Sequence, residues 1–244
     1  MHAGKIRQML IITDGCSNKG EDPVAMAALA REQGVTVNVI GVVEHDSIDE
    51  QGMKEIDGIA MSGGGVSQVV YAEQLSQTVQ MVTRKAMTHT IHAVVNRELQ
   101  QILGQKLTLE DLPPEQRGEV IEVVDELGET SDLEVIILVD ASASMKHKLQ
   151  TVKEALIDLS ISLNARSGKN QFSMLVFPGK RGDFELVLDW TKKLESITGI
   201  FNTISPGGIT PTGPAIREAI RLFNEKRSLR SFLHRDESRI EESM

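Results

Sequence analysis

The sequence predicts an α/β fold built on a mostly parallel sheet with one antiparallel edge strand. Short apolar runs rich in branched residues alternate with segments of helical composition, a pattern typical of parallel sheets covered by helices. Residues 171–177 and 184–190 are two such runs joined by a glycine-rich turn, which predicts an antiparallel hairpin at the edge. With 244 residues, 40% of them hydrophobic, the chain can bury a substantial core.

The first part of the chain predicts strands and helices in strict alternation. Asp22 and Pro23 form an N-cap and first-turn pair ahead of a helix, and Gly34 stands where a C-terminal cap belongs. The expected strands are residues 8–13, 35–43 and 66–71, and the expected helices are residues 24–33, 53–65 and about 72–103.

The second part restarts this alternation after a break. Residues 104–132 are acidic, contain two adjacent prolines and show a single short amphipathic pattern, which indicates a connector. The expected strands after it are residues 134–139, 171–177 and 184–190, and the expected helices are about 145–166, 191–202 and 215–224. From Glu225 onward the chain is strongly charged, and we expect it to fray.

Composition excludes several classes of partner. A net charge of −9, an isoelectric point near 5.2 and only 3% aromatic residues argue against nucleic acid. Cys16 is the single cysteine, so neither an intrachain disulfide nor a Cys/His zinc site is expected. The apolar run near the N-terminus stops at Asp14 and lacks a signal-peptide pattern, and no run approaches the roughly 20 apolar residues of a membrane span. We therefore expect a cytoplasmic protein without a membrane partner.

A group of oxygen-bearing side chains follows the strand at 134–139. Asp140, Ser142 and Ser144 occur at spacing two, so in an extended or turning segment their side chains point the same way. Two hydroxyls and a carboxylate suit a hard cation such as Mg²⁺, with Mn²⁺ as the alternative. Capping of the next helix by Ser144 explains part of the same pattern.

The segments "DASAS", "GGITPTG" and "ITDG" resemble the three parts of the metal-ion-dependent adhesion site of von Willebrand factor type A domains. The resemblance implies a doubly wound, six-stranded sheet with a metal at the carboxyl ends of its strands. It also implies that Ser142, Ser144 and Thr210 bind the metal directly, whereas Asp140 and Asp14 act through bound water. A further stretch, "GIAMSGGGVSQVVYAEQLSQTV", is similar to the last strand and helix of such domains, so the resemblance covers about four-fifths of the chain. It is closest to intracellular bacterial members of the family.

The order of these segments departs from the family, whose members place the "TDG" segment last. A circular permutation within one domain explains this order, because the termini of domains usually lie close together. Asp14 and Asp140 would then meet at neighbouring strands; the alternative is a swapped homodimer that joins the halves of two chains. The expected organisation is a C-terminal-type half at 1–83, a helical and acidic connector at 84–132, an N-terminal-type half at 133–224 and a charged tail at 225–244.

The resemblance implies a non-enzymatic binding module, in which the metal captures a glutamate or aspartate of a partner protein. Two alternatives stay open. Asp140 could be the nucleophile of a Mg²⁺-dependent phosphoryl-transfer enzyme similar to haloacid dehalogenases, although Ser142 stands where such enzymes carry a second aspartate. The chain could also be a scaffold that keeps the fold without a metal. Thr212 competes with Thr210 as a ligand, but capping of the helix that follows is its expected role.

Overall fold

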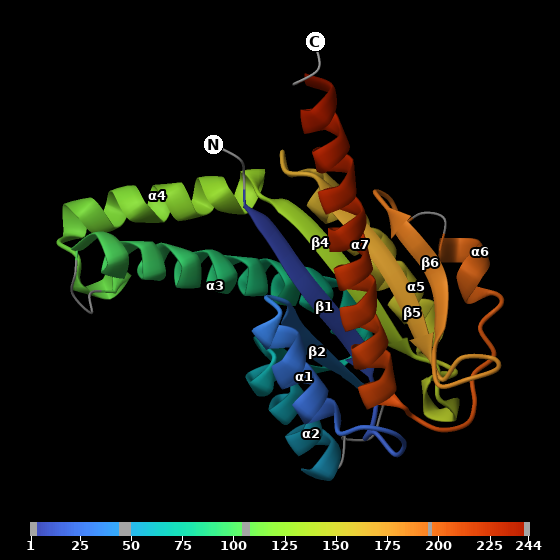
Figure 1. Ribbon diagram of the computed structural model, residues 1–244. Coiled ribbons are helices and arrows are strands. Elements are labelled where there is room, and N and C mark those ends of the chain that lie inside the picture. The colour runs from blue at the N-terminus through green and yellow to red at the C-terminus, as the bar shows by residue number, and fades with distance from the viewer. Residues whose placement is uncertain (1–3, 44–49, 104–107, 195–196, 242–244) are drawn as a thin grey trace.

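The computed structural model describes residues 4–43, 50–103, 108–194 and 197–241. Within them, a six-stranded sheet in the order β3-β2-β1-β4-β5-β6 carries helices on both faces (Figure 1). The strands are β1 (Lys5–Thr13), β2 (Thr36–Val43), β3 (Gly64–Tyr71), β4 (Asp132–Asp140), β5 (Asn170–Phe177) and β6 (Glu185–Thr191). The helices are α1 (Pro23–Glu32), α2 (Glu50–Ser62), α3 (Leu75–Leu103), α4 (Pro114–Thr130), α5 (Leu149–Asn164), α6 (Ile197–Phe201) and α7 (Thr212–Glu241). None of these described helices combines the length and apolar character needed to cross a bilayer.

Two apolar layers, one on each face of the sheet, hold these elements together. Successive side chains of a strand point to opposite faces, so β1 gives Leu10 and Ile12 to one layer and Met9 and Ile11 to the other. Helices α3 to α6 contribute to the first layer, and α1, α2 and α7 to the second. Burial of one such side chain stabilises the fold by about 1.5–3 kcal/mol. Burial on both faces explains why the central strands are apolar at nearly every position.

Strands β1 and β4 lie side by side at the centre of the sheet. They run parallel with Met9 opposite Ile136 and Ile12 opposite Val139. From β1 the chain winds outward through β2 to β3, and from β4 it winds outward through β5 to the antiparallel β6. The winding therefore reverses between β1 and β4. This confirms the predicted doubly wound, mostly parallel sheet with an antiparallel edge strand, and the circularly permuted order of its halves.

The two halves are connected through a pair of helices. The buried side chains of α3 reach from Leu75 to Ile91, and the rest of α3 extends beside α4 as an arm that projects from the body (Figure 1). Near the far end of the arm, the backbone N–H of Leu109 donates to Asn96 Oδ1 over 3.0 Å. Val124 of α4 is buried against the core. The short amphipathic pattern expected in the connector thus corresponds to α4.

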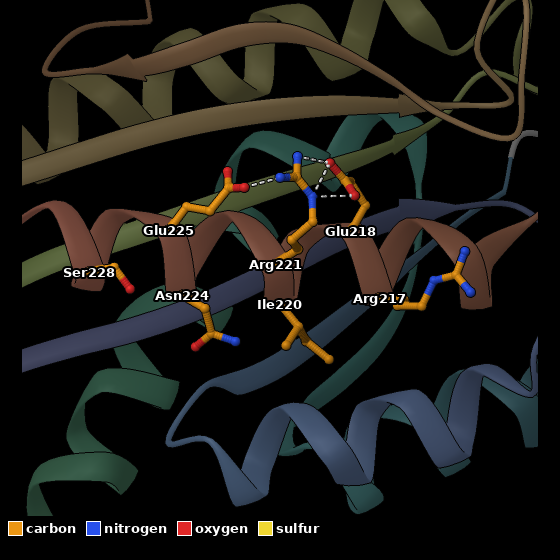
Figure 2. Close-up of a pocket in the computed structure, with 7 residues that line it drawn as sticks. All are labelled: Arg217, Glu218, Ile220, Arg221, Asn224, Glu225 and Ser228. Atoms are coloured by element: carbon orange, nitrogen blue, oxygen red, sulfur yellow. Dashed lines mark hydrogen bonds and ion pairs between the residues drawn. The ribbon is translucent and has the colours of Figure 1, made fainter.

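Helix α7 is much longer than the sequence indicated. The expected helix covered residues 215–224, whereas α7 continues to Glu241. No glycine or proline occurs from 225 to 241, so nothing in the sequence interrupts the helix. Arg221 also forms ion pairs with Glu218 and Glu225, one turn away on either side (Figure 2). Such pairs stabilise a helix by about 0.2–0.5 kcal/mol each.

Other boundaries also differ from the expectations, among them those of β6, α6 and α5. β6 continues to Thr191 and α6 covers only Ile197–Phe201, so the helix expected over 191–202 is shorter. Helix α5 begins at Leu149 rather than near 145, because Ala143–Met145 form a separate 3-10 turn. This turn carries part of the predicted metal site.

A buried arginine joins the connector to the second half of the sheet. Arg166 donates from Nε to the carbonyl oxygen of Gly128 and from Nη2 to that of Ser131, both over 2.8 Å. Its Nη1 donates to Asn170 Oδ1 over 2.7 Å. Gly128 and Ser131 lie at the C-terminal end of α4, where free carbonyl groups need donors and a positive charge is favourable. Arg166 therefore fixes the end of α4 just before β4 begins.

We expect the substitution Arg166→Met to lower the free energy of unfolding by about 3 kcal/mol, because it leaves buried carbonyl oxygens without donors. Chemical denaturation measures this change. The control is Arg84→Met, since Arg84 is exposed and donates only to Ser162 Oγ over 3.2 Å among the bonds the structure gives it. That substitution should cost less than about 0.5 kcal/mol. An equal loss in both variants would contradict this role of Arg166.

Candidate metal centre

The centre begins where β1 and β4 end together. Thr13, the last residue of β1, donates its hydroxyl to Asp140 Oδ2 over 2.6 Å, although 127 positions separate the two residues. Asp140 Oδ1 accepts the backbone N–H of Ser142 over 2.7 Å. Asp140 is fully buried, with 0% of its surface exposed. Both oxygens of this carboxylate are therefore held by the protein itself.

A chain of hydrogen bonds links the two serines to the other half of the domain. The Ser142 and Ser144 hydroxyl oxygens lie 3.1 Å apart, and the Ser144 hydroxyl donates to Asp14 Oδ1 over 2.8 Å. The 3-10 turn at Ala143–Met145 brings the two serines together, as the spacing of two predicted. Ser144 does not cap α5, which begins only at Leu149. Within this chain Asp14 and the serines therefore lie together, as the sequence analysis expected for a circularly permuted domain.

Thr210 reaches this region on a loop that contacts both halves. Its backbone N–H donates to Asn18 Oδ1 over 2.8 Å, and its carbonyl oxygen accepts from the Asn18 N–H over 3.1 Å and from the Ser17 hydroxyl over 3.2 Å. On the same loop, the Gly207 N–H donates to the carbonyl oxygen of Ala141 over 3.0 Å. Thr210 is 7% exposed. The loop is thus held both to the segment after β1 and to the segment after β4.

The hydroxyl of Thr212 is a buried polar group of this region that lacks a hydrogen-bond partner among the described residues. Thr212 is 1% exposed, and its Oγ1 is buried without a hydrogen-bond partner among the described residues. Helix α7 begins at Thr212 itself, and this hydroxyl makes no capping hydrogen bond among the described residues. The expectation that Thr212 caps the helix is therefore wrong. A buried hydroxyl without a partner costs about 1–3 kcal/mol, and a bound ion or water would relieve that cost.

Two contributors were missed by the sequence analysis. Glu55 of α2 accepts the Ser17 N–H over 2.6 Å and so holds the loop after Asp14; partial burial raises the pKa of its carboxyl. Lys148 places Nζ 2.5 Å from Asp14 Oδ2, with 11% of the lysine side chain and 4% of the Asp14 side chain exposed. One sequence signal could have indicated that Lys148 lies near the centre: it follows Ser144 by four residues, and such spacing brings side chains together on a helical turn.

Burial dominates the electrostatics of Asp140. It raises the pKa of the Asp140 carboxyl to about 6, against the hydrogen bonds from Thr13 and Ser142, which favour the charged form; the nearby Asp14 raises it further. An ionised Asp140 is therefore costly in a centre without a cation nearby.

The side chains fit a hard divalent cation by their chemistry. The centre offers hydroxyl and carboxylate oxygens, with no thiol or imidazole in the hydrogen-bonded group described above. Among the described residues, no cluster of three or more His, Cys, Asp and Glu side chains is placed to hold a metal. A metal in this centre would thus depend on the serine and threonine hydroxyls.

One hollow of the described surface lies away from these residues, along α7. It has a volume of about 710 Å³ and is lined by residues of α7, including Arg217, Ile220 and Asn224 (Figure 2). None of the predicted site residues lines it, and both of its arginines are already paired, Arg221 with glutamates of its own helix and Arg217 with Glu21. The candidate site is therefore the group of side chains at the strand ends, and not this hollow.

A doubly wound sheet with polar side chains converging at its reversal point is the arrangement in which open α/β domains bind their ligands. Comparison with known proteins gives the family. Residues 135–240 match the model of the von Willebrand factor type A domain. The chain is also 64% identical over 242 residues to "Uncharacterized protein YabS" of Bacillus subtilis (strain 168), with 99% of each chain covered.

A solved structure shares the whole fold. The crystal structure of an uncharacterized protein from Alicyclobacillus acidocaldarius matches with a TM-score of 0.87 and 40% identity, over 93% of this chain and 98% of that chain. The chain belongs to the von Willebrand factor type A family, and its permuted order of halves spans the full length of these relatives.

The raised pKa of Asp140 predicts a pH-dependent stability in the presence of a chelator. An unfolded aspartate ionises near pH 3.8, whereas the folded one holds its proton to about pH 6, so the native state binds more protons in this window. The free energy of unfolding should therefore fall by up to about 3 kcal/mol as the pH rises from about 4 to about 7.

The substitution Asp140→Asn should remove this part of the slope, and Asp158→Asn should keep it, because Asp158 is exposed on α5. Urea denaturation at several pH values measures all three proteins. Parallel profiles for the wild type and Asp140→Asn would show that the assigned cause is wrong.

Proposed function

We propose that this protein is a binding module whose centre holds Mg²⁺, or Mn²⁺, and captures a glutamate or aspartate of a partner protein. The observation that carries the proposal is the contact of Ser144 with Asp14, which joins the motif after β4 to the motif after β1.

The two aspartates are suited to act through water. Both oxygens of Asp140 already accept hydrogen bonds from Thr13 and Ser142, so this carboxylate is poorly placed to bind an ion directly. Neutral hydroxyls of Ser142, Ser144 and Thr210 then supply the direct ligands. A divalent ion with mainly neutral direct ligands keeps much of its positive charge and accepts a further carboxylate at an open position. Ser144 is exposed, so an incoming carboxylate has access.

The enzymatic alternative receives less support from the same contacts. A nucleophilic aspartate needs a free oxygen that faces the substrate. Asp140 is fully buried, and each of its oxygens is held by a donor of the protein. We therefore propose a non-enzymatic role, which a screen with generic phosphate esters tests directly: turnover that depends on Mg²⁺ and on Asp140 would refute it.

The metal-free scaffold is favoured by one specific observation, the ion pair between Lys148 and Asp14. In that case the ammonium group supplies the positive charge permanently, and no divalent ion binds. Metal titration separates this alternative from the leading proposal.

We expect isothermal titration with Mg²⁺ and Mn²⁺ to give one site in the wild type. Ser142→Ala and Thr210→Ala should each weaken binding at least about tenfold, because each removes an oxygen that the proposal makes a direct ligand. Ser76→Ala is the matched control, since its hydroxyl donates to Asp158 outside the centre. Unchanged affinity in Ser142→Ala and Thr210→Ala would place the metal elsewhere, and no binding in any protein would favour the scaffold.

The open coordination position has its own test. In the Mn²⁺-loaded protein, acetate should displace bound water and lower the water proton relaxation rate in the wild type. The loss should be absent in Ser142→Ala at the same total Mn²⁺. If acetate leaves the rate of the wild type unchanged, the proposed carboxylate capture is wrong even where the metal binds.

A further inference from the structure

The side chain of Lys148 forms an ion pair with Asp14, one of the two carboxylates that the proposed metal site needs. Lys148 Nζ lies 2.5 Å from Asp14 Oδ2 and 3.5 Å from the carbonyl oxygen of Ser144. Asp14 Oδ1 meanwhile accepts the Ser144 hydroxyl. The ammonium group thus contacts the same residues that the proposed centre requires.

The backbone of Lys148 is fixed, so this contact does not depend on a loose chain. Its N–H donates to the carbonyl oxygen of Met145 over 2.9 Å, and its own carbonyl oxygen accepts from the Val152 N–H over 2.9 Å. The neighbouring Met145 and Leu149 are both buried in the core. Only the side chain of Lys148 is therefore free to change its position.

The location of Lys148 is locally unfavourable. It is the residue that precedes the first turn of α5, a helix of 16 residues, where the helix dipole favours negative charge and disfavours a cation. Nothing in the helix itself stabilises an ammonium group there. The partner that compensates is Asp14 in the other half of the domain. A local preference overridden in this way is most often found at functional sites.

A divalent cation and this ammonium group cannot share Asp14 without strong repulsion. Charges within about 4–6 Å of each other in partly buried positions shift binding equilibria by one to three powers of ten. We infer that Lys148 is an internal competitor for the metal: it pairs with Asp14 when the metal is absent, and its displacement sets the metal affinity of the centre. This inference rests on the proposed metal-binding function.

The test compares Lys148→Met with Lys146→Met by isothermal titration with Mg²⁺ and Mn²⁺ at one pH and ionic strength. Lys146 is the matched control because it is exposed in the same segment and has no ion pair in the described structure. We expect Lys148→Met to bind the metal about 10- to 1,000-fold more tightly than the wild type. Lys146→Met should stay close to the wild type.

A second measurement reports on the metal-free state. In chelator, Lys148→Met should lower the melting temperature, because Asp14 loses its cationic partner. Saturating Mg²⁺ should then raise the melting temperature of Lys148→Met by more than it raises that of the wild type. If Lys148→Met does not fold without metal, Lys148→Gln replaces it, since the amide can still donate to Asp14 without carrying a charge.

The possible outcomes separate the proposed metal-binding function from the role given to Lys148. Equal metal affinity in the wild type and the Lys148 variants, with Ser142→Ala weaker, overturns the inference and leaves the proposed function intact. Absence of metal binding in every protein overturns both. Tighter binding in Lys146→Met as well as in Lys148→Met would assign the effect to the net charge of the segment, and it would also overturn the role given to Lys148.

Discussion

The parallel pairing of β1 with β4 is the constraint on which the rest of the structure depends. It joins the two halves of a chain whose motifs lie in permuted order, and it aligns Ile12 with Val139 just before both strands end. Asp14 and Asp140 then follow at the same edge of the sheet, linked through Thr13, Ser142 and Ser144. Because side chains alternate between faces, a slip of one residue in this pairing would turn Thr13 away from Asp140 and separate the motifs.

The centre balances charge in an unusual way. One carboxylate, Asp140, is buried and satisfied by neutral donors, and the other, Asp14, is neutralised by the ammonium group of Lys148. A centre of this design does not need a bound ion to be stable, because the lysine neutralises Asp14. On the proposed function, the same lysine competes with the metal for Asp14, so the affinity of the centre depends on this side chain as well as on the hydroxyl ligands.

Much of the architecture could be predicted from sequence because its signals are local. Apolar runs ended by "DG" and by "DASAS" located β1 and β4, and the glycine-rich turn before residue 184 located the antiparallel β6. The end of α7 could not be predicted in the same way, because a run of charged residues without glycine or proline is compatible both with a frayed tail and with a continued helix. Lys148 and Glu55 were missed because each contacts the segment after β1 across a long separation that no short motif reports.

The separation of 127 positions between Thr13 and Asp140 also has a consequence for biosynthesis. At about 5–20 residues per second, a ribosome completes β1 roughly 6–25 seconds before it completes β4, the strand that pairs with the edge of β1 opposite β2. During that interval the nascent polypeptide carries an apolar, unpaired parallel strand, the kind of edge that invites aggregation. The early helices and the long arm of α3 can form in the meantime, so the permuted order makes the timing of translation part of how this domain reaches its native state.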